Sequence, residues 1–266
     1  MYNQFEIESH FDGKLQVVYL NNPATYNALT KPALAELKDF FHRVNNDDEI
    51  RCVAISGRGK AFCSGQNLSD AFVQGESQQN ENLIYKIVKD YYNPLVMEIT
   101  HCKKPVIALV NGPAVGAGAM LALICDFVLA SEKAYFSQAF SNIGLIPDTG
   151  GTYFLPKLVG RQMAQYLAFT GKKLCADDAY RLGLVAEVFS EDEFTTKSME
   201  ILENMANMPT SALKLTKKAF AHSYDNSLEK QLRLEAELQE KASRTDDFKE
   251  GVSAFLEKRK PQYKGK

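Results

Sequence analysis

The stretch KPVIALVNGPAVGAGAMLALICDFVLAS, residues 104–131, decides the fold class of this chain. It opens with an apolar run that predicts a buried strand, and a glycine-rich loop, NGPAVGAGA, follows at 111–119. The apolar residues beyond the loop predict a helix around 116–124, and 124–131 predicts the next strand. Strands and helices that alternate in this way are typical of an α/β fold.

The flanking segments repeat this alternation. Further strands are predicted at 14–21, 50–56, 133–139 and 184–190. Helices are predicted from Thr30 to about Val44, over 83–101, after Gly150–Gly151, and over 161–169 and 176–182. The polar residues 69–82 show little periodicity, and we expect a mobile loop there that covers a pocket.

After residue 190 the strand signals stop, and only helical segments follow. We therefore expect a core domain over residues 1–195 and a C-terminal helical segment over residues 196–266. That segment either docks on the core or on a neighbouring subunit, or it completes a single core. In its longest helix, Asn226 and Glu229 have the spacing of a capping box.

The composition excludes several classes of function. The chain has 266 residues, 45% of them hydrophobic, which suits a soluble protein with a large core. A net charge of −2 gives no basic surface for nucleic acid, and no apolar run is long enough to cross a membrane. The N-terminus lacks a signal-peptide pattern, and the five scattered cysteines suit buried thiols, so we expect a cytoplasmic protein.

Two glycine-rich loops and one aspartate carry the candidate chemistry. AFCSGQNL at 61–68 and NGPAVGAGA at 111–119 each follow a predicted buried strand, so both loops can offer main-chain N–H groups to one oxygen. Asp148, in GLIPDTGGT, is a candidate proton carrier beside them. The spacing fits neither a dinucleotide fingerprint, a P-loop nor a serine-nucleophile elbow, and no metal-binding motif occurs.

Several segments together resemble the crotonase (enoyl-CoA hydratase/isomerase) superfamily, in the right order and over nearly the whole chain. They are PATYNALT at 23–30, GKAFCSGQNL at 59–68, the stretch 104–131, FSNIGLIPDTGGTYFLPKLVG at 140–160, ADDAYRLGLVAEV at 176–188 and EGVSAFLEKRKPQY at 250–263. The resemblance implies a spiral of repeated ββα units with a C-terminal helical segment that forms trimers, which pair into hexamers. It also implies an acyl-CoA thioester as substrate, with CoA arriving as part of it and no separate cofactor.

By motif position, the resemblance assigns the thioester oxygen to the main-chain N–H groups of Gln66 and Ala117. Family hydratases hold water with two glutamates, but this chain has Met120 and Phe140 at those positions. Family members with an acid at position 148 include isomerases, so the resemblance favours Asp148 as the acid and base of an isomerase. We expect an apolar wall of Met120, Phe140 and Ile143 to raise the pKa of Asp148.

The resemblance also implies a set of residues that bind the substrate and its CoA part, with the last two expected to reach CoA from an adjacent subunit. Besides Met120 and Phe140, they are Asn27, Ala28, Ala61, Ser64, Gly65, Asn67, Leu68, Gly116, Phe255 and Lys258.

Three alternatives to the isomerase stay open. The first is an enoyl-CoA hydratase that uses Asp148 alone. The second is an aryl-CoA dehalogenase, but those pockets use Trp and His, and this chain has no Trp. The third, from a different class, is a non-catalytic protein that binds acyl-CoA without turning it over.

Overall fold

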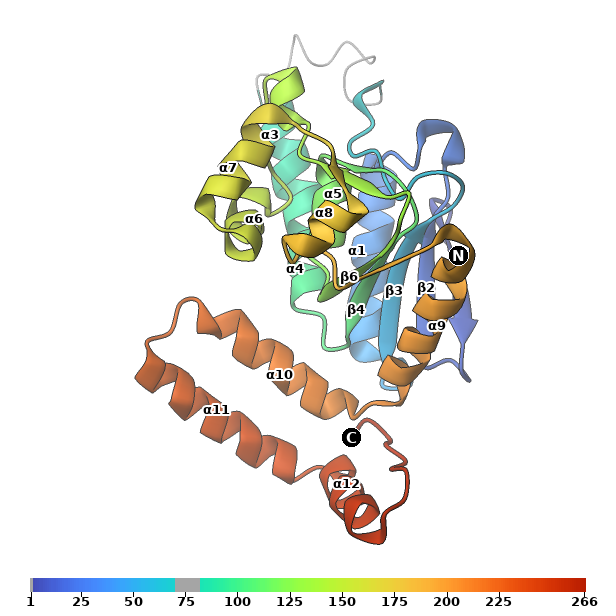
Figure 1. Ribbon diagram of the computed structural model, residues 1–266, viewed down its shortest axis with the longest axis vertical. Coiled ribbons are helices and arrows are strands. Elements are labelled where there is room, and N and C mark those ends of the chain that lie inside the picture. The colour runs from blue at the N-terminus through green and yellow to red at the C-terminus, as the bar shows by residue number, and fades with distance from the viewer. Residues whose placement is uncertain (1, 70–81) are drawn as a thin grey trace.

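The computed structural model describes residues 2–69 and 82–266, and it has the α/β architecture that the sequence predicts (Figure 1). The expected pocket loop over 69–82 falls, except for its two ends, outside the described residues. In Figure 1 the sheet and most helices form the upper body, and three helices near the C-terminus lie below it.

A twisted main sheet forms the centre of the upper body. Its described strands, in spatial order, are β1 (Phe5–His10), β2 (Leu15–Leu20), β3 (Cys52–Gly57), β4 (Val106–Val110), β6 (Phe127–Ser131) and β9 (Glu187–Phe189). Only β1 and β2 pair antiparallel, and the other neighbours pair parallel. Strands β3 and β4 are buried along their whole length, which explains their continuous apolar sequence.

A small second sheet lies beside the glycine-rich loops. It consists of β5 (Ala114–Val115), β7 (Tyr135–Ser137) and β8 (Leu174–Cys175), in the order β5-β7-β8. The sequence did not predict β1, β5 or β8, because β1 is a largely exposed edge strand and the other two contain only two residues each. Strand β5 follows directly on the second glycine-rich loop's opening turn, so it fixes where that loop leaves the core.

Helices cover both faces of the main sheet. The described helices of the upper body are η1 (Pro23–Thr25), α1 (Lys31–Asn46), α3 (Leu83–Ile87), η2 (Val88–Tyr92), α4 (Asn93–Thr100), α5 (Ala117–Leu123), η3 (Phe140–Ile143), α6 (Gly151–Val159), α7 (Arg161–Thr170), α8 (Ala176–Arg181) and α9 (Glu191–Asn207). Helices α1, α4 and α5 pack on one face in the larger hydrophobic core, and α9 packs on the other. The expected domain boundary at 195/196 falls inside α9, whose Phe194 and Leu202 both belong to the core.

The helix predicted over 83–101 contains a π-helical turn, η2, between α3 and α4. A π turn adds one residue and rotates every later side chain relative to a regular α-helix. As a result Tyr92 is 2% exposed, whereas regular α-helical periodicity through Ile84, Ile87 and Leu95 would bury Tyr91 instead. This shift brings the Tyr92 hydroxyl into the candidate site.

The three helices below the upper body are α10 (Thr210–Ser223), α11 (Leu228–Ser243) and α12 (Asp246–Glu257). The predicted capping box was wrong: Ser227, not Asn226, caps α11, and its hydroxyl accepts the N–H of Lys230. Polar contacts tie α10 to the upper body. Lys217 Nζ lies 2.7 Å from Asp126 Oδ2, and Arg51 Nε donates to Thr210 Oγ1 over 3.1 Å.

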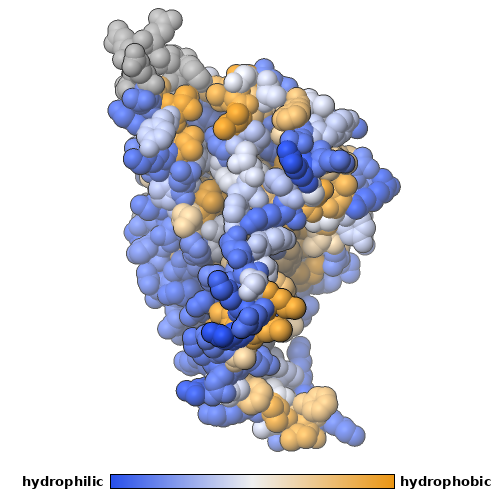
Figure 2. Space-filling view, turned by 90° about the vertical axis from the view of Figure 1, so that its left-hand side faces the viewer, coloured by the Kyte–Doolittle hydropathy of each residue, from blue (hydrophilic) through white to orange (hydrophobic). Residues whose placement is uncertain are grey.

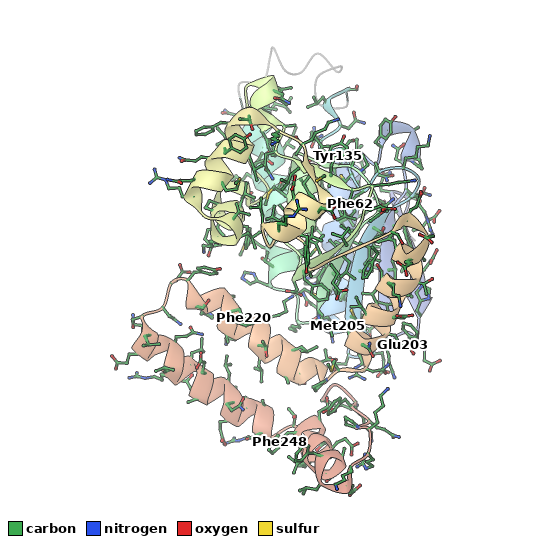
Figure 3. All side chains as sticks on the ribbon, in the orientation of Figure 1. Phe62, Tyr135, Glu203, Met205, Phe220 and Phe248 are labelled. Carbon is green, nitrogen blue, oxygen red and sulfur yellow. The ribbon has the colours of Figure 1, made fainter. Side chains whose placement is uncertain are left out.

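These three helices carry large apolar side chains that are exposed in the single chain. They are Phe220, Tyr224, Leu228, Leu232, Phe248, Val252, Phe255 and Leu256. Figure 2 shows hydrophobic patches over the lower part of the molecule, where these helices lie. Figure 3 contrasts Phe220 and Phe248 on this segment with Phe62, which lies inside the upper body and is fully buried. Such exposed apolar surface is typical of a protein–protein contact.

Candidate active site

The first glycine-rich loop orients the main-chain N–H of Gln66. The Gly65 carbonyl accepts the Leu29 N–H over 2.7 Å, and the Asn67 N–H donates to the Leu29 carbonyl over 2.9 Å. All peptide bonds of the described chain are trans, so the Gln66 N–H points opposite to the Gly65 carbonyl and away from Leu29. This N–H donates to no acceptor in the described residues.

The second glycine-rich loop presents the N–H of Ala117 in the same way. Ala117 is the first residue of α5, and Gly116 before it has φ 55°, which favours glycine. The Gly116 carbonyl accepts the Met120 N–H over 3.1 Å within the helix, so the Ala117 N–H points out of the helix end. It too has no hydrogen-bond acceptor in the parts of the chain that the structure describes.

The two loops meet at Gly65. A Cβ atom on Gly65 would lie 3.4 Å from the Ala117 nitrogen and 2.8 Å from the Val115 carbonyl oxygen. Gly65 also has φ 92°, a conformation that side chains with a Cβ rarely adopt. The unpartnered N–H groups of Gln66 and Ala117 are therefore close neighbours, and they can bind one developing oxyanion between them.

Asp148 is half-buried, between η3 and α6. The Thr149 hydroxyl donates to Asp148 Oδ1 over 2.8 Å. Burial raises the pKa of Asp148 above its ordinary value, although the hydrogen bond from Thr149 acts in the opposite direction. A raised pKa brings a carboxylic acid closer to the range in which it can both take and return a proton.

Thr149 adopts an unusual backbone conformation for its residue type. Its φ is 53°, in the left-handed region, and its side chain is 2% exposed. A β-branched residue in this region is strained, at a cost on the order of 1–3 kcal/mol. The surrounding turn holds it there, and in this conformation its hydroxyl reaches the Asp148 carboxylate.

The apolar wall expected beside Asp148 is present only in part. Met120 is fully buried and Phe140 is 7% exposed, but Ile143 is 53% exposed and faces away from the core, so the prediction for Ile143 was wrong. The cause is η3, a tight 3-10 turn whose last residue lies on its outer side. Met120 packs against the turn after Asp148, since a Cβ on Gly151 would lie 3.5 Å from its sulfur.

The Tyr92 hydroxyl contacts the side chain of Gln66 in the first loop. This hydroxyl donates to Gln66 Oε1 over 2.7 Å, and Gln66 Nε2 donates to the Asn67 carbonyl over 3.2 Å. Burial, and then the nearby Cys63 and Asp148, raise the pKa of Tyr92 well above its ordinary value. Sequence analysis assigns no hydrogen-bonding role to Tyr92, because only the π turn of η2 directs this side chain inward.

Several residues that the sequence assigned to CoA have structural contacts in the loops. The Asn27 side chain is buried, accepts the Asn22 N–H and donates to the carbonyls of Arg58 and Ala61. Ser64 Oγ donates to the Thr25 carbonyl over 2.9 Å. These bonds stabilise the conformation of the first loop, so the side chains of Asn27 and Ser64 have a structural role there.

The other assigned residues differ in their distance from the amide pair. Ala28 is half-buried and Leu68 is 41% exposed, both close in the chain to the first loop. Phe255 and Lys258 belong to α12 and its C-terminal cap, at the opposite end of the molecule from α5 (Figure 1). Phe255 is 82% exposed. The single chain therefore does not bring these two residues to the site.

Within 2–69 and 82–266, the histidine, cysteine and acidic side chains form no group of three that could hold a metal ion. In the same ranges, no helix has the length and apolar character to cross a membrane.

Comparisons with known proteins match almost the whole chain. The family model "Enoyl-CoA hydratase/isomerase" matches residues 10–266. The 1,2-epoxyphenylacetyl-CoA isomerase of Escherichia coli (strain K12) is 40% identical over 98% of each chain, and the crotonyl-CoA hydratase of Syntrophomonas wolfei is 36% identical over 94% of each. A solved enoyl-CoA hydratase from Bacillus anthracis has TM-score 0.92 and 31% identity, covering 99% of this chain and 100% of that one. These matches confirm the fold expected from the sequence motifs.

Proposed function

Since the chain belongs to the enoyl-CoA hydratase/isomerase family, the crotonase superfamily, we propose that it is an acyl-CoA isomerase. It shifts a double bond, or opens a ring epoxide, through an enolate whose oxygen is bound by the N–H groups of Gln66 and Ala117. One observation carries this proposal. Asp148 is a half-buried carboxylate whose pKa burial raises, and the N–H groups of Gln66 and Ala117 have no acceptor in the described residues, whereas Met120 and Phe140 replace the carboxylates that would hold water.

The reaction needs a single carboxylate. Asp148 takes a proton from the carbon next to the thioester of a 3-enoyl-CoA, and the electron pair moves through the double bond system onto the carbonyl oxygen. The two amides stabilise this dienolate, a contribution for which each donor typically accounts for about 3 kcal/mol of barrier. Asp148 then returns the proton to the far end of the dienolate, which leaves the double bond conjugated with the thioester.

In this proposal the chain supplies all of the chemistry with its own residues and the substrate. CoA enters as part of the thioester and leaves with the product, so no separate cofactor and no metal ion takes part. The side chains of Asn27 and Ser64 keep the first loop rigid.

An enoyl-CoA hydratase is the second candidate, because relatives such as the Syntrophomonas wolfei protein carry that name. The two candidates are tested by incubating the enzyme with a 3-enoyl-CoA, with crotonyl-CoA and with a ring epoxide of phenylacetyl-CoA. We expect the conjugated-thioester absorbance to rise with the 3-enoyl-CoA, or mass-neutral conversion of the epoxide by mass spectrometry and NMR. Rapid loss of that absorbance with crotonyl-CoA would favour the hydratase instead.

We also propose that the protein forms homotrimers, alone or paired as hexamers, through α10, α11 and α12. The support is the set of exposed apolar side chains on these helices, among them Phe220, Phe248 and Phe255. In such an assembly a neighbouring α12 could bring Phe255 and Lys258 to the CoA of the next subunit. Sedimentation velocity measures the assembly directly, and a monomer at micromolar concentration would contradict this proposal.

A further inference from the structure

Both polar atoms of the Gln66 side chain form hydrogen bonds. Its Oε1 accepts the Tyr92 hydroxyl over 2.7 Å, and its Nε2 donates to the carbonyl of Asn67, the next residue, over 3.2 Å. The Tyr92 phenol is 2% exposed, so no water competes for this hydrogen bond. The bond also joins segments 26 residues apart in the chain, which makes it a tertiary contact.

The segment from Gly65 to Asn67 also forms backbone hydrogen bonds with Leu29. Leu29 donates to the Gly65 carbonyl and accepts from the Asn67 N–H, so it holds the peptides on both sides of Gln66. Gly65 itself is glycine with φ 92° and has little intrinsic preference for one conformation. The Gln66 peptide is therefore held by backbone bonds on the Leu29 side and by one side-chain bond on the Tyr92 side.

We propose that Tyr92 is a positioning residue for the oxyanion-binding amides: by fixing the Gln66 side chain, it holds the Gln66 N–H at the angle that meets the thioester oxygen beside the Ala117 N–H. This inference rests on the proposed function. It gives a role to the side chain at position 66, which a purely main-chain donor would not need. It also gives the π turn of η2 a purpose, since only that turn directs the Tyr92 hydroxyl to Gln66.

The test compares Tyr92→Phe with Tyr91→Phe. Both changes remove one phenolic oxygen from adjacent positions, but the Tyr91 hydroxyl has no hydrogen-bond partner in the described residues, and Tyr91 is only half-buried. We expect Y92F to lower kcat about tenfold with little change in KM, because a slightly misplaced donor weakens transition-state binding more than ground-state binding. We expect Y91F to keep wild-type kinetics.

A spectroscopic measurement separates donor placement from a general loss of structure. A saturated acyl-CoA with a ¹³C-labelled thioester carbonyl is bound to each protein, and the carbonyl stretch is read by isotope-edited infrared spectroscopy. Wild type and Y91F should move the band to lower wavenumber, whereas Y92F should move it clearly less. Circular dichroism and the melting temperature establish that each variant is folded.

A double-mutant cycle gives a second test that does not depend on Tyr92 tolerating substitution. Gln66→Met removes the acceptor of the Tyr92 hydroxyl but keeps the main-chain N–H. We expect Q66M to lower kcat about as much as Y92F, and the double variant to lose no more than either single variant. Independent, multiplying losses would overturn the inference.

The outcomes also distinguish this inference from the proposed function. If wild type shifts the carbonyl band and Y92F shifts it equally with unchanged kcat, Tyr92 has no positioning role but the amide pair stands. If wild type itself leaves the carbonyl band at its position in free acyl-CoA, the oxyanion site is wrong, and the role of Tyr92 falls with it.

Discussion

Gly65 and Ala117 approach so closely that a methyl group on Gly65 would stand 3.4 Å from the Ala117 nitrogen. That methyl group would also press on the Val115 carbonyl and would occupy the space in which the two amides meet. We therefore expect Gly65→Ala to lower kcat/KM at least about 100-fold, the loss typical for one oxyanion donor. Steady-state kinetics with a 3-enoyl-CoA measures this effect.

The control for this prediction is Gly13→Ala. Gly13 has φ 88°, close to the value at Gly65, but a Cβ there would meet no atom within 4 Å. Both variants should lose on the order of 1 kcal/mol of stability from the unfavourable φ, yet only G65A should lose activity. Equal activity in the two variants would show that the space between the loops is not used in catalysis.

Asp148→Asn should remove activity but stabilise the fold at neutral pH. Because burial raises the pKa of Asp148 in the folded chain, its ionised form disfavours folding above that pKa, and this penalty disappears as the pH falls below the ordinary carboxyl range. The D148N variant cannot ionise. Its melting temperature should exceed that of wild type at about pH 8, and the difference should shrink as the pH falls toward the ordinary Asp pKa of about 3.9.

The same variant should lower kcat by about 10² to 10⁴-fold, the range for losing a general acid and base. Thermal unfolding and kinetics on one protein preparation measure both effects. A D148N protein with normal turnover would exclude Asp148 as the proton carrier, and with it the isomerase mechanism proposed above.

Thr149→Val should shift the pH dependence of the reaction. Valine keeps the β-branched shape but removes the hydroxyl whose hydrogen bond lowers the pKa of Asp148. The pKa of Asp148 should then rise further, and the acid limb of kcat/KM should move to higher pH. Thr152→Val is the matched control, because Thr152 is exposed in α6 and should leave the profile unchanged.

Lys217→Met should destabilise the attachment of the C-terminal helices. Lys217 Nζ lies 2.7 Å from Asp126 Oδ2 and 3.1 Å from the Lys104 carbonyl, so its loss leaves a partly exposed carboxylate without its cation. We expect a loss of about 2 kcal/mol in the free energy of unfolding, below the cost for a fully buried pair because both side chains are partly exposed. Urea unfolding measures it, with the exposed Lys218→Met as control.

Local sequence signals predicted those parts of the fold that depend on neighbouring residues. Thr30 does cap α1, and its hydroxyl accepts the Ala33 N–H as the Thr–Pro pattern indicated. The buried strands β3 and β4 likewise follow from their apolar runs. The two-residue strands β5 and β8 could not be predicted, because they exist only through partners distant in the chain.

In the candidate site, too, some features could be predicted from the sequence and others could not. The motifs located the loops around Gln66 and Ala117, although the backbone bonds that orient the Gln66 N–H run to Leu29, which is distant in the chain. They could not reveal the hydroxyl of Tyr92, which depends on a π turn, nor the outward position of Ile143, which depends on a 3-10 turn. Both turns change the direction of a side chain by a fraction of a helical turn. Neither the composition nor the hydrophobic periodicity of the sequence predicts such a change.

In the proposed mechanism the two oxygen-binding donors belong to the polypeptide backbone, so no substitution at positions 66 or 117 other than proline can delete them. The side chains at positions 120, 140 and 148 can therefore differ without removing these two donors. A scaffold of this kind can acquire a new reaction by relocating one acid around a fixed thioester, which separates the binding of a substrate class from the choice of what is done to it.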